Sequence, residues 1–170
     1  MNTQIRLLSP ADAQQLFTLR HQALLDSPYA FSASPEDDRI ASIAAAREQL
    51  GRGPDCAIIG AFAEGLVGML GMYRLPQLKT AHIAYIWGVF VAPQWRGHGL
   101  AKGLLEAAIA HARTLSGVTS LQLSVNETTP GARRAYEGVG FQAWGVEPDA
   151  LRFNGRSTSE THMSLALTEA

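Results

Sequence analysis

Uncharged, mostly apolar residues fill the stretch from residue 80 to residue 91, shortly before Pro93. An apolar run of this length without charge is typical of a strand that is buried on both faces. Apolar residues then recur at helical spacing from Leu100 onward, until Gly117 provides a helix stop. The pattern therefore predicts a central strand over 80–91 and a helix from His98 to about Gly117, joined by a glycine-containing loop.

The same pattern predicts the other elements of the chain. Alternation and turn residues predict strands over 4–8, 55–63, 66–73, 118–125, 141–145 (extending toward 153) and 161–167. Helical spacing and capping residues predict three further helices, over 10–26, from the acidic cluster 34–38 to Leu50, and over 131–139. In the second of these helices, Ile40, Ile43 and Ala44 are expected to face inward. Tight turns make the N-terminal strands antiparallel, whereas a strand–helix–strand unit is a right-handed parallel crossover. We therefore expect a mixed α/β fold with one twisted sheet of six or seven strands, antiparallel at first and parallel from the central strand, and helices on both faces.

Two glycines occupy the loop after the central strand. Gly97 and Gly99 let a ligand approach the backbone, and the first amides of the following helix have no intrahelical partner. Together with the helix dipole and the charge of Arg96, they indicate an anion site, most often for phosphate. A Walker loop is excluded because Lys102 is followed by glycine and not by Ser or Thr. A dinucleotide fingerprint fits less well because residues 93–96 separate the strand from the glycines, and a plain tight turn is the simpler alternative.

Two sequence blocks stand with one predicted helix and one predicted strand between them. The first is Gln94-x-x-Gly97-x-Gly99 followed by Leu100-Ala101, and the second is Asn126 followed by the segment Ala-Arg-Arg-Ala-Tyr-Glu-Gly-Val-Gly-Phe over 132–141. Together they resemble the acetyl-CoA pyrophosphate loop and the later strand end and helix of the GNAT superfamily of N-acetyltransferases. The resemblance covers about residues 5–167 and is firmest over 83–141. It implies a single acetyltransferase domain over residues 1–170, with acetyl-CoA as cosubstrate.

The resemblance also implies how the cofactor is held. Backbone groups of Val89, Phe90 and Val91 would pair with the pantetheine arm as an added strand would. The amide of Val91 would polarise the thioester carbonyl. The pyrophosphate would lie on amides of the glycine loop, which are those of Arg96, Gly97, His98, Gly99, Leu100 and Ala101.

Three residues of the second block are candidates for contacts with the cofactor. Asn126 matches a cofactor-contacting asparagine of the family, with an ordinary turn residue as the alternative. Arg133 could meet a CoA phosphate or be a solvated helix residue. Tyr136 matches the family's general acid, and a phenol with a pKa of about 10 can stay protonated and stabilise a thiolate whose pKa is about 8.5. The alternative for Tyr136 is a packed ring that hydrogen-bonds a carbonyl.

The general base is left open by the sequence. Family members often use a glutamate on the central strand, but residues 80–91 contain no carboxylate. This stretch offers His82, whose neutral imidazole could accept a proton, although a structural role is common for a lone histidine. A water chain, or an acid such as Glu36 or Glu64, is the alternative. The family's usual asparagine before the proline of the second block is Thr129 here.

Composition limits the possible partners. The chain has 170 residues, a net charge of −1 and no basic run, which argues against nucleic acid or an acidic membrane surface. The N-terminus lacks a signal-peptide pattern and the longest uncharged run is short for a membrane span, so a cytoplasmic protein is expected. No metal-ligand spacing occurs, and the one cysteine, Cys56, is predicted to be a buried thiol. Trp87, Trp95 and Trp144 are predicted in the core or in a pocket wall.

These observations predict an N-acetyltransferase that moves an acetyl group from acetyl-CoA directly to a primary amine. The acceptor could be a small amine, an amino acid, an antibiotic or a peptide. A non-catalytic acyl-CoA-binding sensor or interaction module is the alternative, because an obvious base is missing. A homodimer is possible, since acyltransferases of this type often pair through late strands.

Overall fold

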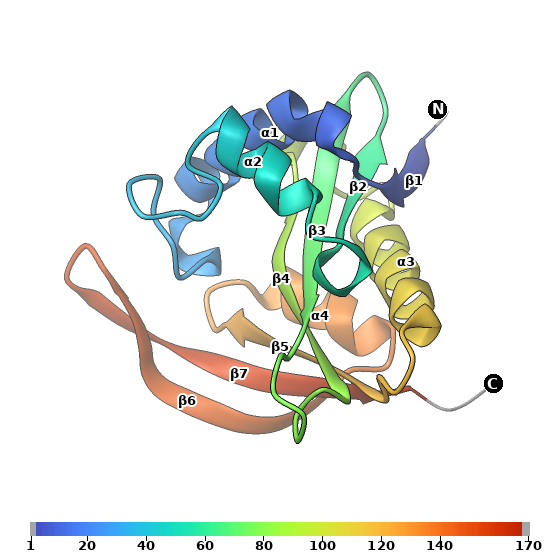
Figure 1. The fold of residues 1–170 in the computed structure, drawn as a ribbon. Coiled ribbons are helices and arrows are strands. Elements are labelled where there is room, and N and C mark those ends of the chain that lie inside the picture. Colours follow the sequence, from blue (N-terminus) through green and yellow to red (C-terminus); the bar gives the residue numbers. More distant parts are fainter. Residues whose placement is uncertain (1–2, 168–170) are drawn as a thin grey trace.

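A seven-stranded sheet with the strand order β1-β2-β3-β4-β5-β7-β6 forms the centre of the computed structural model, which describes residues 3–167 (Figure 1). The strands are β1 (Gln4–Leu7), β2 (Ile58–Phe62), β3 (Leu66–Arg74), β4 (Ile83–Val91), β5 (Ser120–Asn126), β6 (Gln142–Phe153) and β7 (Arg156–Ala166). The α-helices are α1 (Ala13–Asp26), α2 (Ile43–Leu50), α3 (Leu100–Thr114) and α4 (Pro130–Gly138). Single 3₁₀ turns cover Pro10–Asp12, Pro28–Ala30, Pro54–Cys56 and Pro93–Trp95.

The sheet is mixed, as the sequence predicts. The β4–β5 pair is parallel, and all other neighbouring strands are antiparallel. The parallel ladder is short, because it joins only residues 83–85 to residues 120–122, and β5 then turns away from β4 (Figure 1). The β6–β7 ribbon is long and extends past the rest of the sheet.

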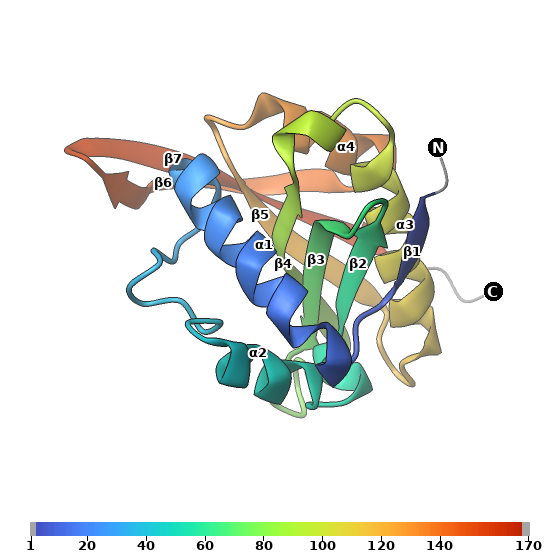
Figure 2. The same cartoon turned by 90° about the horizontal axis from the view of Figure 1, so that it is seen from above.

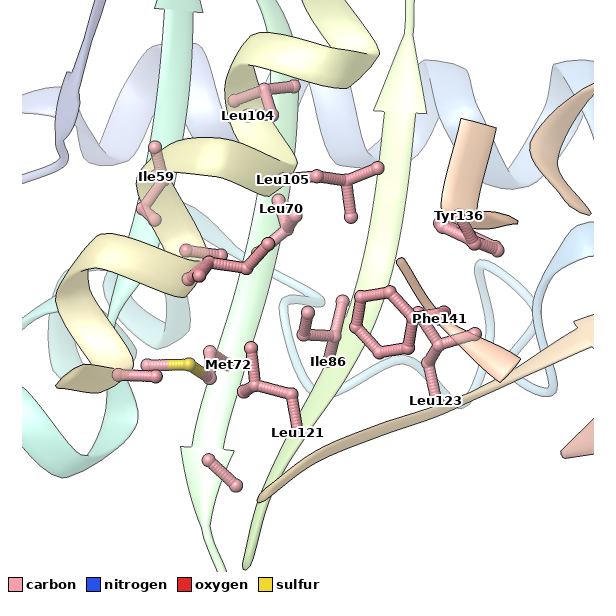
Figure 3. Close-up of a cluster of buried hydrophobic side chains, with 14 of the residues drawn as sticks. Ile59, Leu70, Met72, Ile86, Leu104, Leu105, Leu121, Leu123, Tyr136 and Phe141 are labelled. Atoms are coloured by element: carbon pink, nitrogen blue, oxygen red, sulfur yellow. The ribbon is translucent and has the colours of Figure 1, made fainter. Parts of the chain in front are cut away.

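Helices cover both faces of the sheet (Figure 2), and a hydrophobic core fills the space on each side. One packs α3 and α4 against the sheet, with Leu104 and Leu105 of α3 and Ile86 of β4 among its buried members (Figure 3). The other packs α1 against the opposite face through residues such as Leu16 and Phe90. Both faces of β4 are therefore covered, which explains its nearly continuous apolar sequence.

A β-bulge interrupts β4 near Gly88. Trp87 pairs with Gly71 and Phe90 with Met69, so two residues of β4 face one residue of β3. Gly88 has φ +63°, a left-handed conformation that favours glycine. The extra residue reverses the alternation of side chains, so Phe90 points to the α1 core.

The second helix is shorter than predicted. It begins at Ile43, because the Ser42 hydroxyl accepts a hydrogen bond from the Ala45 N–H at 3.1 Å and caps the helix there. The acidic residues that were expected to start it serve a turn, in which Asp37 accepts the Ser34 N–H at 2.6 Å. Ile40 is buried as expected, but Ile43 and Ala44 are exposed, so their predicted inward orientation is wrong.

Several strand boundaries also differ from the prediction. The central strand begins at Ile83 because residues 80–82 form a turn, and β2 begins at Ile58 because a 3₁₀ turn precedes it. Cys56 in that turn is half-buried rather than buried. Trp144 is 61% exposed, so its predicted place in the core or a pocket wall is wrong. Within residues 3–167, no helix combines the length and the apolarity needed to cross a bilayer.

Candidate active site

The divergence of β4 from β5 opens a cleft in the sheet. Beyond the last ladder pair, Tyr85 with Gln122, the edge of β4 that faces β5 has no strand partner. The Ala92 N–H donates to the Val67 carbonyl on the other side at 2.9 Å. Because successive N–H groups of a strand point to opposite edges, the Val91 N–H points to the open edge.

A cavity of about 700 Å³ fills this cleft. It is lined by the end of β4, the glycine loop, the 27–31 segment and α4, through Ser27, Ala30, Phe31, Val89, Phe90, Val91, Arg96, Gly97, Ala101, Thr128, Thr129, Pro130, Gly131, Ala132, Arg134, Ala135 and Tyr136. The predicted strand residues Val89, Phe90 and Val91 therefore lie together with the loop and with Tyr136. The lining is mainly apolar with a few polar groups, as is typical of a site for a small molecule or cofactor.

The glycine loop ends in the N-terminus of α3. Gly97 and Gly99 have φ +79° and +76°, and no atom lies within 4 Å of the position where a Cβ would stand on either. The first bond of the helix runs from the Gly103 N–H to the Gly99 carbonyl, which leaves the amides of the first turn free. Free amides beside open space are the groups that an anion site requires, so this end of the cleft is the candidate place for a phosphate.

Not every predicted loop residue offers its groups to this site. The Arg96 amide is engaged, since it donates to the Pro93 carbonyl at 3.2 Å. The ring of His98 folds back, with Nδ1 2.9 Å from the Arg96 carbonyl. The Leu100 side chain belongs to the core, so Leu100 can contribute only its backbone.

The Arg96 side chain holds the loop in place. Its Nε donates to the Val91 carbonyl at 3.0 Å, and its Nη2 pairs with Asp26 of α1 at 2.7 Å. The Ser27 hydroxyl and Arg96 together lower the pKa of the Asp26 carboxyl. The positive charge that the sequence placed at the rim is therefore largely matched by Asp26, and Arg96 connects α1, β4 and the loop.

Tyr136 lies at the α4 margin of the main core, beside Phe141 (Figure 3). It is 7% exposed and lines both the cleft and a narrow space of about 60 Å³ next to it. Burial raises the pKa of its phenol well above the usual value, so the hydroxyl stays protonated at neutral pH. Among the described residues no group hydrogen-bonds this hydroxyl, so the alternative of a carbonyl-bonded tyrosine does not apply.

Asn126 serves the turn that precedes α4. Its Nδ2 donates to Thr158 Oγ1 at 2.8 Å, and its Oδ1 accepts from the backbone and the hydroxyl of Thr128. The Asn126 carbonyl accepts the Thr129 hydroxyl at 2.9 Å. Asn126 lines the narrow space, but its side chain is engaged within the protein, which matches the turn-residue alternative.

The two neighbouring arginines of α4 differ in position. Arg133 pairs with Glu137 on the exposed side of the helix at 2.9 Å and does not line the cleft. Arg134, which the sequence reasoning passed over, lines the cleft. The structure therefore replaces Arg133 with Arg134 as the candidate contact for a phosphate group.

A second cavity, of about 390 Å³, lies on the other side of the narrow space. It is lined by Arg20, Ala30, Phe31, Ser32, Ala33, Asp37, Asp38, Arg39, Tyr85, Ile86, Trp87, Gly88, Ser124 and Glu160. The narrow space shares Gly88 and Ser124 with this cavity and Val89 and Tyr136 with the cleft, so it lies between the two. The cleft therefore has a charged chamber as its neighbour, which we call the acceptor chamber.

A buried ion pair forms one wall of the acceptor chamber. Arg20 of α1 holds Asp38 through Nε at 3.0 Å and Nη2 at 2.7 Å, and both side chains are at most 5% exposed. The guanidinium lies over the rings of Phe31 and Trp87, with its central carbon 4.9 and 5.5 Å from their centroids. Sequence reasoning missed Arg20, although a charged residue on the apolar face of α1 was a readable signal.

His82 is not part of this site. It is exposed and lies in the turn before β4, at the end of that strand opposite to Val91. Val89 lies seven positions further along the chain, a span of up to about 23 Å at about 3.3 Å per residue in a strand. The prediction that His82 acts as a base is therefore not supported by its position. Within residues 3–167, no three His, Cys, Asp or Glu side chains gather as a metal site would require.

Comparison with known protein families identifies the fold that carries this site. Residues 16–141 match the model of the acetyltransferase (GNAT) family, which is most of the chain. The chain belongs to the GNAT family. The matched region includes the glycine loop, the open edge of β4 and Tyr136.

Individual relatives match over shorter regions. The chain is 38% identical to a mycothiol acetyltransferase of Thermobispora bispora over 65 residues, which are 38% of the length of this chain and 22% of that of the relative. It is 26% identical to a spermidine N(1)-acetyltransferase of Vibrio cholerae over 88 residues, which are 52% of the length of this chain and 51% of that of the relative. The chain thus spans between a fifth and a half of the length of these relatives.

A solved structure extends the likeness of the fold to the whole chain. An acetyltransferase of Salmonella typhimurium, solved with its cofactor acetyl-CoA, superimposes with a TM-score of 0.82. The alignment covers 100% of this chain and 96% of that one at 23% identity. At this identity the likeness confirms the mixed α/β fold and no more.

Proposed function

We propose that this protein is an N-acetyltransferase that moves the acetyl group of acetyl-CoA directly to a primary amine. The observation that carries the proposal is the cleft that joins the first turn of α3, the open edge of β4 and Tyr136 in one lining, with the acceptor chamber beside it. Membership in the GNAT family supports it. The cytoplasm is the proposed location, and a homodimer stays a prediction.

The residues of the cleft fit acetyl-CoA. The amides of the first turn of α3 and the open space over Gly97 suit a pyrophosphate. The unpaired edge of β4 at Val89 and Val91 offers backbone groups to an amide-containing arm, as a strand would to its neighbour. Arg134 lies where it can meet a phosphate. Acetyl-CoA would supply an activated acetyl group.

Two groups of this chain act on the reacting atoms. The Val91 N–H would donate to the carbonyl oxygen as negative charge develops there. The N–C bond forms as the C–S bond breaks, and the Tyr136 hydroxyl would give its proton to the departing sulfur. The phenolate then regains a proton from the nitrogen that has attacked, which is still positively charged and becomes the neutral amide nitrogen, so Tyr136 ends the cycle unchanged. The other proton of the starting ammonium leaves before the attack.

The test is an acetylation assay with acetyl-CoA and a panel of three amines, namely spermidine, 2-phenylethylamine and L-methionine. The reaction is monitored through the free CoA thiol that it releases. The wild-type protein is expected to acetylate at least one of them. Tyr136→Phe is expected to lower kcat about 100-fold, within the range of general acid catalysis, without weakening acetyl-CoA binding. Tyr73→Phe is the control, since Tyr73 lines neither cavity. Binding of acetyl-CoA without turnover of any amine would favour a sensor instead.

A further inference from the structure

Three carboxylates line the acceptor chamber, and two of them are already engaged. Asp38 holds the Arg20 guanidinium and also accepts the Ile40 N–H at 3.1 Å. Asp37 accepts the Ser34 N–H at 2.6 Å. Within residues 3–167, no hydrogen bond or ion pair engages the carboxylate of Glu160, which is half-buried on β7.

The sheet places Glu160 beside a residue that lines the narrow space together with Tyr136. On β7 it is the register partner of Asn126 on β5, and Asn126 lines the narrow space beside Tyr136. Glu160 shares the chamber with Tyr85 and Ser124, whose hydroxyls are 3.1 Å apart. Burial raises the pKa of Tyr85, and the negative charge of Glu160 raises it further, which agrees with their proximity.

The ionisable groups around Glu160 come from four directions. Tyr85 is on β4, Glu147 is on β6 and its partner His162 is on β7. The remaining groups line the same chamber and belong to α1 and the 37–39 segment, namely Arg20, Asp37, Asp38 and Arg39. Glu147 is paired with His162 at 2.8 Å, and Arg20 with Asp38 at 2.7 Å. The Arg39 guanidinium lies over the Trp87 ring. No cation among the described residues is paired with Glu160, so its charge is available to a ligand.

We propose that Glu160 binds the ammonium group of the acceptor and takes one of its protons before the attack on the thioester. The proposal rests on the proposed function. It assigns the base that β4 does not provide, because residues 83–91 contain no carboxylate. It also defines the acceptor as a primary amine that enters the chamber as a cation.

The proton transfer balances within the site. The N–H bond of the ammonium breaks and its electron pair becomes the nucleophile, while an O–H bond forms on Glu160, which later releases the proton to water. An alkylamine with a pKa of about 10 is about 10³-fold more protonated than free at pH 7.

Glu160→Gln tests this role, with Glu127→Gln as the matched control. Glu127 lies at the end of β5 nearby, is exposed and accepts the Ser159 N–H at 2.9 Å, which glutamine can also do. With the best amine of the panel at pH 7, Glu160→Gln is expected to lose about 10²–10³-fold in kcat/KM. The loss should shrink as the pH approaches 10, because the free amine then forms in solution. Glu127→Gln should stay within about 2-fold of wild type.

Thermal shift with acetyl-CoA is the second readout. Glu160→Gln should bind acetyl-CoA as the wild type does, and Glu160→Asp, which keeps the carboxylate, should show an intermediate rate. A rate within 3-fold of wild type for Glu160→Gln, or a loss that is constant from pH 7 to pH 10, would overturn the role of Glu160 while the proposed function stands. Absence of acetylation by the wild-type protein would overturn both.

Discussion

The buried pair of Arg20 and Asp38 offers a quantitative test of how the acceptor chamber is built. Both charges are removed from water, Asp38 satisfies two of the guanidinium nitrogens, and Nη1 of Arg20 has no partner among the described residues. Removing one member leaves the other as an unmatched buried charge, which costs about 3–5 kcal/mol. We therefore expect Asp38→Asn to destabilise the fold by this amount, although asparagine can still accept the Ile40 N–H.

The expected shift in melting temperature is large. For a chain of this size, 1 kcal/mol corresponds to about 2–4 °C, so Asp38→Asn should melt roughly 6–20 °C below wild type. Arg20→Met should lose a similar amount. The double variant removes both charges and keeps an unbranched side chain in place of Arg20, so we expect it to lose only about 1–2 kcal/mol. Glu106→Gln, which breaks the exposed pair with Lys102, is the control and should change stability by less than about 0.5 kcal/mol.

Urea unfolding of wild type, the two single variants, the double variant and the Glu106→Gln control measures these free energies. We expect a coupling energy of at least about 2 kcal/mol between Arg20 and Asp38, since the stability effects of substitutions at residues in contact are not additive. Two results would show that the ion pair does not stabilise this wall of the chamber. One is a loss of stability in the double variant that equals the sum of the two single losses within about 0.5 kcal/mol, and the other is a loss below about 1 kcal/mol for Asp38→Asn.

Two further predictions concern the cofactor cleft and the N-terminal turn. Arg134→Gln should weaken acetyl-CoA binding about 10-fold in a calorimetric titration at low salt, whereas Arg133→Gln should leave it unchanged, and equal effects would contradict the assignment. Arg6 lowers the pKa of Asp12 to about 2, so the ionised carboxylate stabilises the fold above about pH 4 and this contribution is lost between about pH 4 and pH 2. Asp12→Asn should therefore destabilise the fold by about 1–2 kcal/mol at pH 7, a value reduced to account for the solvent exposure of Arg6. In denaturant titrations, the difference in unfolding free energy from wild type should narrow toward pH 2.

The elements that the sequence predicted well share one property, which is that local signals determine them. The apolar run of β4 and the two glycines before α3 each act over a few residues, and the structure confirms the strand and the loop. The start of α2 was misjudged because two local signals competed there. Acidic residues suit a helix N-terminus, but the Ser42 cap and the buried bond of Asp38 to Arg20 decided the boundary.

Features that depend on tertiary contacts could not be read from the chain. β4 and β5 diverge because their ladder contains only three residue pairs, and no sequence pattern predicts so short a ladder. Glu160 enters the acceptor chamber only because β7 inserts between β5 and β6, although 75 residues of sequence separate it from Tyr85 in the same cavity. Arg133 and Arg134 carry the same side chain, and only the orientation of α4 distinguishes them.

The most direct measurement of the central claim, that acetyl-CoA binds along the β4 edge with its pyrophosphate on the glycine loop, is a thermal-shift titration of two glycine variants. Gly97 and Gly155 both have positive φ and open space at the Cβ position, but Gly97 lines the cleft and Gly155 lies in the β6–β7 turn. At about 100 times its Kd, acetyl-CoA should stabilise wild type and Gly155→Asp by about 2.7 kcal/mol, a shift of about 5–10 °C. Gly97→Asp, which places a carboxylate at the anion site, should show no shift. An equal shift in both variants, or none in wild type, would contradict the claim.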